Sequence, residues 1–119
     1  MQSELRGRNW DRFMKVLETH DVILSPTIQF TAFTVEEWDA AWNKDGAKYP
    51  HGTFAPTYTA DTHMFNWLGW PALSIPVGFI DGLPIGMQLI TKPNREAQLY
   101  RAAAAFLDAY PRTERPAVS

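Results

Sequence analysis

The chain has 119 residues, of which 45% are hydrophobic and 20% charged, and this composition is typical of a single folded globular domain. The formal net charge is −2, from 13 acidic and 11 basic residues without a basic run, so we expect no nucleic-acid partner. The absence of cysteine excludes disulfides and thiolate metal sites. No apolar stretch is long enough to span a bilayer, and the N-terminus lacks a signal-peptide core, which predicts a cytoplasmic protein with no membrane partner.

The first half of the sequence predicts two helices around one short strand. Residues 1–19 place large apolar side chains at helical spacing between charged ones, which favours an amphipathic helix. Residues 20–30 hold a β-branched run closed by Pro26, a pattern typical of a strand buried on both faces and its exit. Residues 34–44 open with the capping-box pair Thr34 and Glu37 and predict a short helix. Trp38 and Trp42 share one face of it, which favours a core role over a stacking platform.

The second half predicts a loop, a helix, a hairpin and a closing helix. Residues 46–60 are punctuated by glycine and proline and indicate a variable loop. Residues 61–90 predict a helix capped by Asp61, followed by two β-rich runs around the tight turn Asp81-Gly82. Pro76 indicates an edge, a bulge or a kink in the first run. Residues 94–110 predict a helix that starts at Asn94, and residues 111–119 a frayed tail.

This order of elements predicts an α/β fold over residues 1–119, a small mixed sheet of about three strands with flanking helices. Such a sheet has two edges, and four short helices do not cover all of its apolar surface, which includes five tryptophans. Uncovered apolar surface usually indicates a missing neighbour. We therefore expect this chain to associate, either with further copies of itself or with another polypeptide.

Four segments in order resemble the C-terminal region of the amidase-signature family. Residues 20–27, HDVILSPT, are similar to its strand exit, and residues 62–78, THMFNWLGWPALSIPVG, to its "T-x-x-x-N-x-x-G-x-P-A-x-S-x-P-x-G" stretch. Residues 81–90, DGLPIGMQLI, resemble "D-G-L-P-x-G-x-Q-L-I", and Glu96-Ala97 opens a helix like the family's closing one. The resemblance covers most of residues 20–107 and implies the C-terminal part of the amidase-signature fold.

The matched positions that we interpret as structural are mainly those that fix strand entries, kinks and close packing. They are Asp21, Pro26, Gly69, Pro71, Ser74, Pro76, Gly78, Gly82, Pro84, Gly86 and Gln88.

The resemblance also implies carboxamide hydrolysis by a nucleophilic serine, a second serine and a lysine, with no cofactor. In the family those residues lie upstream of everything matched here, so we assign no catalytic residue to this chain and expect it to be inactive alone. Its serines are Ser3, Ser25, Ser74 and Ser119, none in a Gly/Ser-rich loop. For Ser74, a core or backbone-bonding hydroxyl is the favoured interpretation.

Two further groups of residues have competing interpretations. His51, Asp61 and His63 lack ligand-pair spacing, so we expect surface histidines and no metal site. The resemblance places Thr62, Asn66 and Trp67 beside the acyl pocket, as candidates to line or brace it. The alternative for Asn66 is a side chain that bonds backbone in the turn from helix to strand.

Three hypotheses about function remain at this point. The chain is the C-terminal portion of an amidase, or a non-enzymatic module that self-associates, or a subunit that complements a separate catalytic polypeptide. The expected partner is therefore either the missing N-terminal portion of an amidase or further copies of this chain in a homo-oligomer.

Overall fold

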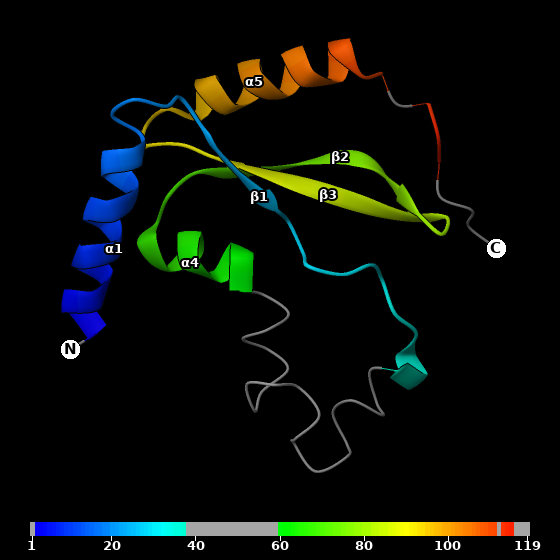
Figure 1. Cartoon of the computed structure of the whole chain (residues 1–119), viewed down its shortest axis with the longest axis horizontal. Coiled ribbons are helices and arrows are strands. Elements are labelled where there is room, and N and C mark those ends of the chain that lie inside the picture. Colours follow the sequence, from blue (N-terminus) through cyan, green and yellow to red (C-terminus); the bar gives the residue numbers. More distant parts are fainter. Residues whose placement is uncertain (1, 38–59, 112, 116–119) are drawn as a thin grey trace.

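The computed structural model describes residues 2–37, 60–111 and 113–115. Trp38, Trp42, His51 and Ser119 lie outside these residues, as does most of the loop expected over residues 46–60. The elements, shown in Figure 1, are α1 (Gln2–Val16), β1 (Ile23–Pro26), α4 (Ala60–Leu68), β2 (Ala72–Ile80), β3 (Leu83–Ile90) and α5 (Glu96–Ala109). The described helices and strands follow one another in the predicted order, whereas residues 38–44 of the helix expected over residues 34–44 lie outside the described residues. No described helix is long and apolar enough to cross a membrane.

The three strands form one sheet in the order β1-β3-β2. Both neighbouring pairs are antiparallel, so β1 and β2 run in the same direction on opposite sides of β3. The predicted α/β class and the three-stranded sheet are confirmed. The expectation of a mixed sheet is wrong for the described strands, because both hydrogen-bonded strand pairs are antiparallel. The two strands that run parallel, β1 and β2, do not pair with each other.

The hairpin between β2 and β3 closes at Asp81-Gly82, as predicted. Ile80 pairs with Leu83 across a two-residue turn. Asp81 and Gly82 have φ values of 51° and 78°, and a type I′ turn needs positive φ at both positions. The right-handed twist of the flanking strands favours this turn type.

We expect Gly82→Ala to lower the free energy of unfolding by about 1 kcal/mol, because a Cβ disfavours positive φ. Nothing lies within 4 Å of that Cβ position, so the effect comes from backbone conformation alone. Urea denaturation of Gly82→Ala and Gly82→Asn separates a backbone effect from an effect of the added side chain. Asparagine tolerates positive φ better than alanine, so it should cost less stability. Equal losses in the two variants would contradict the backbone explanation.

Two prolines occupy edge positions of the sheet. Thr27 N–H donates to the Gly86 carbonyl at 3.0 Å, and Thr91 N–H donates to the Pro71 carbonyl at 3.3 Å. Because hydrogen-bonding positions alternate along an antiparallel ladder, the nitrogens of Pro26 and Pro76 point away from β3. Neither proline therefore removes a hydrogen bond from the ladder. The register also shifts between Pro76 and Gly78, so of the three alternatives for Pro76 the structure shows an edge strand with an irregularity of the bulge type.

Two apolar clusters lie on opposite faces of the sheet. In Figure 1, α5 (orange) runs along one face, whereas α4 (green) lies on the other side with α1 (blue) beside it. The α4-side cluster is centred on buried Phe65, Leu68 and Ile90, and the expected stripe of α1 packs against it. The α5-side cluster is centred on Ile75 and Leu89, together with the predicted stripe of α5. Burial on both faces fixes the register of β3, since a one-residue slip would exchange the two clusters.

Strand β1 departs from the expectation that it is buried on both faces. Leu24 lies on the same face as its partner Leu89, but it is 55% exposed. Helix α5 contacts β2 and β3, so β1 receives little cover on this side. The expectation is therefore wrong for the described part of the chain.

The helix ends agree only in part with the prediction. Gly69 has φ 75° and ends α4: its N–H donates to the Asn66 carbonyl at 3.1 Å, and Trp70 N–H donates to the Phe65 carbonyl at 3.0 Å. These two bonds form a Schellman motif. At the start of this helix Asp61 lies within the first turn, after Ala60, instead of capping it. Helix α1 also ends earlier than expected, at Val16 instead of near residue 19.

At the other two helix N-termini, one predicted start is confirmed and the other is wrong. At residues 34–37, Glu37 N–H donates to Thr34 Oγ1 at 3.1 Å and Thr34 N–H donates to Glu37 Oε2 at 2.7 Å, so the predicted capping box is confirmed. Helix α5 begins at Glu96, not at Asn94. Asn94 has φ 62°, a left-handed conformation incompatible with a helical residue, and Arg95 is the N-cap without a side-chain bond.

Candidate functional site

A row of polar side chains crosses the sheet on the face that α4 covers. The register places Ser25 of β1 and Ser74 of β2 on either side of Gln88 in the central strand. Thr27 and Gly86 continue the row beyond the end of β1. Because side chains alternate between faces along each strand, all of them project toward the same side of the sheet.

Gln88 joins the sheet to α4. Its side chain is buried, with 4% exposed, and Nε2 donates to Ser25 Oγ at 3.0 Å and to the Asp61 carbonyl at 3.1 Å. The Asp61 carbonyl belongs to the first turn of α4. An amide nitrogen carries two protons, and each of them has an acceptor here. Gln88 therefore fixes the position of the helix turn that contains Thr62.

The hydroxyls of Thr27 and Ser74 meet above Gly86. Thr27 directly follows β1 and Ser74 lies in β2, on the other side of the central strand, yet Thr27 Oγ1 and Ser74 Oγ are 2.7 Å apart. A Cβ on Gly86 would lie 2.9 Å from the threonine oxygen and 3.0 Å from the serine oxygen. The contact across the central strand is possible because residue 86 has no side chain.

Both serines have hydrogen-bond partners, but Ser74 is exposed and bonds a side chain, so the expectation of a core or backbone-bonding hydroxyl is wrong for it. Ser25 Oγ accepts from Gln88 and donates to the Pro26 carbonyl at 3.3 Å, while Ser74 bonds Thr27. In the described part of the chain, neither hydroxyl contacts a lysine, a histidine or a carboxylate. A serine nucleophile needs an adjacent base to accept its proton. The interactions seen within this row are hydrogen bonds between neutral groups.

A hollow of about 420 Å³ adjoins the hydroxyl pair. Its walls are largely apolar, with Phe30, Phe33 and Ile85 beside Thr27 and Ser74. No ionisable side chain lines it within the described residues. Such a surface favours a neutral group with an apolar body over a charged one.

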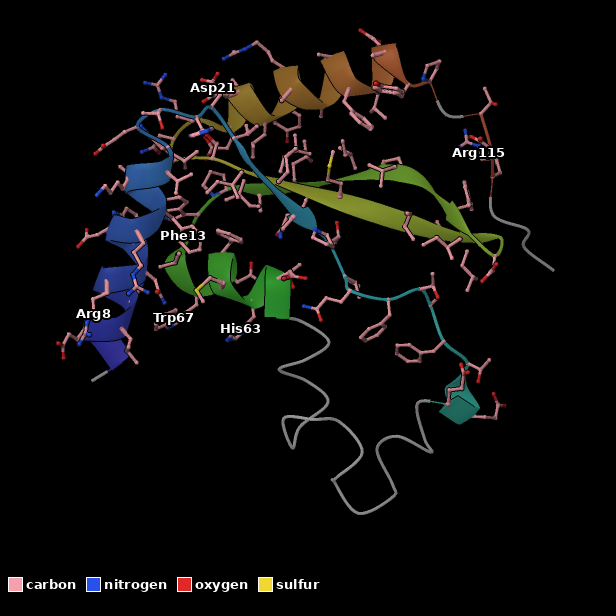
Figure 2. The ribbon with its side chains drawn as sticks, viewed as in Figure 1. Arg8, Phe13, Asp21, His63, Trp67 and Arg115 are labelled. Atoms are coloured by element: carbon pink, nitrogen blue, oxygen red, sulfur yellow. The ribbon has the colours of Figure 1, made fainter. Side chains whose placement is uncertain are left out.

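The structure separates the three pocket candidates of α4. Thr62 is half-buried in the first turn, and Asn66 is exposed one turn later on the same side of the helix. Trp67 faces another way: it is half-buried toward α1, where it lines a shallow hollow with Arg6 and Trp10 (Figure 2). Contact of any of the three with a substrate stays a prediction.

A second polar junction fixes the entry of β1. Asp21 lies beside the first turn of α5 (Figure 2), and its carboxylate accepts from Gln98 Nε2 at 2.8 Å. Thr91, with 1% exposed, donates its hydroxyl to the Asp21 carbonyl at 3.0 Å. The sequence motifs indicated Asp21 but gave no role to Thr91 or Gln98. The only available signal was the position of Thr91 directly after a matched strand.

Of the three residues considered as metal ligands, Asp61 and His63 are described by the structure and His51 is not. His63 is exposed on α4 and Asp61 is half-buried. In residues 2–37, 60–111 and 113–115, no three histidine, aspartate or glutamate side chains form a group that suits a metal ion.

The sequence of this chain matches the model of a known protein family. The protein-family model for Amidase matches residues 1–100. The chain belongs to the Amidase family, and the resemblance read from its four segments is confirmed.

The chain is similar in sequence both to amidotransferase subunits and to an acylamidase. A glutamyl-tRNA(Gln) amidotransferase subunit from Streptococcus mutans is 41% identical over 105 residues, which are 87% of this chain and 19% of that protein. An acylamidase of Rhodococcus erythropolis is 31% identical over 102 residues, 85% of this chain and 20% of that protein. The chain thus spans about a fifth of the length of these relatives.

Solved structures agree with the sequence comparison. A glutamyl-tRNA(Gln) amidotransferase subunit from Thermotoga maritima has a TM-score of 0.75 and 29% identity, covering 98% of this chain and 23% of that one. A bacterial aryl acylamidase of the amidase-signature family has a TM-score of 0.70 and 27% identity, covering 92% and 22%. The fold of this chain therefore occurs as one part of a longer polypeptide.

Proposed function

We propose that this chain is the C-terminal portion of a carboxamide hydrolase of the amidase-signature type and has no amidase activity alone. The observation that carries the proposal is the engagement of Ser25 and Ser74 in structural hydrogen bonds, away from any described base. The match to about a fifth of each relative supports it, because it leaves most of such an enzyme to other sequence.

In the complete enzyme this portion holds a wall of the substrate site. The bond from Gln88 to the Asp61 carbonyl positions the first turn of α4, and with it Thr62. Asn66 is exposed on the same side of the helix and is available to a substrate or to the catalytic part. Trp67 braces α4 against α1. The nucleophilic serine, its partner serine and the lysine act from the remaining part.

The isolated chain is expected to show no turnover of simple amides or esters above the uncatalysed rate. A chromogenic anilide assay over a range of protein concentrations checks this, with a complete acylamidase as the positive control. The matched variant is Ser74→Ala, which removes the hydroxyl that lies beside the apolar hollow. Turnover by the wild-type chain that disappears in Ser74→Ala would overturn the proposal.

A second candidate function is a module that associates with its own copies. The exposure of two large apolar side chains favours it, Leu24 at 55% and Ile80 at 51%. Light scattering over a wide concentration range distinguishes this candidate, since a folded monomer at high concentration contradicts it.

A further inference from the structure

We propose that the hollow beside Thr27 and Ser74 is a binding site for an uncharged aryl compound that carries a hydrogen-bond acceptor, such as an aryl ketone. The site goes beyond the proposed function, because it requires recognition of a ligand and no bond cleavage. Three properties of the hollow carry the assignment: a spare hydroxyl proton, aromatic and proline walls, and the lack of an ionisable side chain among its described lining residues.

The hydroxyl pair has one proton to offer. Two hydroxyl groups carry two protons, and the bond between Thr27 Oγ1 and Ser74 Oγ uses one of them. Within residues 2–37, 60–111 and 113–115, the second proton has no protein acceptor. Both residues line the hollow, so a ligand atom that accepts a hydrogen bond can reach this proton there.

The pair is held in place before any ligand arrives. The backbone N–H of Thr27 donates to the Gly86 carbonyl at 3.0 Å, and Ser74 lies within β2 in register with Gln88. The mutual bond of the two hydroxyls fixes their side chains as well. A ligand therefore does not have to order these groups, and that ordering would otherwise reduce its affinity.

The walls of the hollow suit a flat apolar body. The rings of Phe30 and Phe33 lie with their centroids 5.9 Å apart and tilted by 51°, and Pro76, Pro84 and Ile85 also line the hollow. Aromatic rings favour offset or edge contacts with a further ring. The volume of about 420 Å³ is within the usual range of small-molecule sites.

Charge and position select the ligand further. An ionised group loses its hydration at an apolar surface, so a carboxylate is disfavoured where no described lining residue can pair with it. A second hollow of about 420 Å³ shares Ile28, Phe30 and Thr31 with this one, but its lining does not include Thr27 or Ser74. The hydroxyl pair therefore assigns the ligand to the first hollow.

The test is a titration of the isotope-labelled full chain, followed by nuclear magnetic resonance, with acetophenone and with benzoate. For ligands of this size we expect acetophenone to bind with a Kd of about 1–10 mM. Benzoate should bind about tenfold more weakly or worse, because it is ionised. Nuclear Overhauser contacts should join acetophenone to Phe33 and Pro84, which line this hollow, and not to Ile80 and Met87, which line the second one.

Variants of the hydroxyl pair test the spare proton. Ser74→Ala leaves the Thr27 hydroxyl free to donate, and Thr27→Val leaves that of Ser74, so each single variant should bind acetophenone within about twofold of wild type. The double variant has no such proton and should bind about fivefold more weakly or worse. Ser25→Ala is the matched control, since its hydroxyl lies on the same face of the sheet but does not line this hollow.

Thermal melts show that each variant is folded, and the comparison of the two ligands on the wild type needs no variant. Unsaturable binding of acetophenone, equal affinity for benzoate, wild-type affinity in the double variant, or contacts to Ile80 and Met87 alone would each overturn the assignment. None of these results depends on whether the isolated chain hydrolyses amides, which tests the proposed function separately.

Discussion

Gly86→Ala is expected to destabilise the chain by about 2 kcal/mol, the usual cost of adding a methyl group to a packed site. The new Cβ would lie 2.9 Å from Thr27 Oγ1, 3.0 Å from Ser74 Oγ and 3.3 Å from Thr27 Cβ. Thr27 follows β1 and Ser74 lies in β2, so relieving the contact requires both side chains to turn away or the backbone to move. Urea denaturation followed by circular dichroism measures the change.

Gly7→Ala is the matched control for this substitution. Gly7 lies inside α1, and nothing is within 4 Å of its Cβ position, so alanine should stabilise the chain by up to about 1 kcal/mol. The cost of Gly86→Ala should also fall when Thr27→Ala and Ser74→Ala remove both oxygens. A Gly86→Ala variant as stable as the wild type would show that the hydroxyl pair is not held above residue 86.

Gln88→Leu is the second change with a large expected effect, a loss of about 2–3 kcal/mol from leaving partly buried acceptors without a donor. Leucine keeps most of the volume of glutamine but cannot donate to Ser25 Oγ or to the Asp61 carbonyl. The first turn of α4 should loosen as well. Hydrogen exchange of the α4 amides, together with urea denaturation, measures both effects.

Ser25→Ala provides the comparison for Gln88→Leu. It removes one of the two acceptors and leaves the bond to the Asp61 carbonyl, so we expect less than half the loss and unchanged exchange in α4. Equal losses in the two variants would show that the link to α4 contributes nothing to stability.

Local sequence was sufficient where a structural feature depends on neighbouring residues. The turn at Asp81-Gly82 needs two positive φ values, and the capping pair at Thr34 and Glu37 needs only its own spacing. The stripes of α1, α4 and α5 follow from helical periodicity. Helix ends were predicted less well: α5 begins at Glu96 after the left-handed Asn94, Asp61 does not cap α4, and α1 ends at Val16.

The polar row required the tertiary structure, because its members lie far apart in sequence. Thr27 and Ser74 are separated by 47 positions, and Gln88 and Ser25 by 63, and no periodicity links such distant residues. The matched motifs identified Ser74, Gly86 and Gln88 as structural but not their common contacts. The motif match also could not separate Trp67 from Asn66 as pocket candidates. These neighbours in sequence face different sides of the helix.

The sequence by itself determined the family, the order of helices and strands, and the turn and kink positions, since each depends on short-range patterns of proline, glycine and apolar residues. The tertiary structure decided that β3 is the central strand, that two hydroxyls meet above Gly86, and that α5 covers β2 and β3 but not Leu24. These features depend on which distant segments pack together, and packing is set by burial over the whole chain.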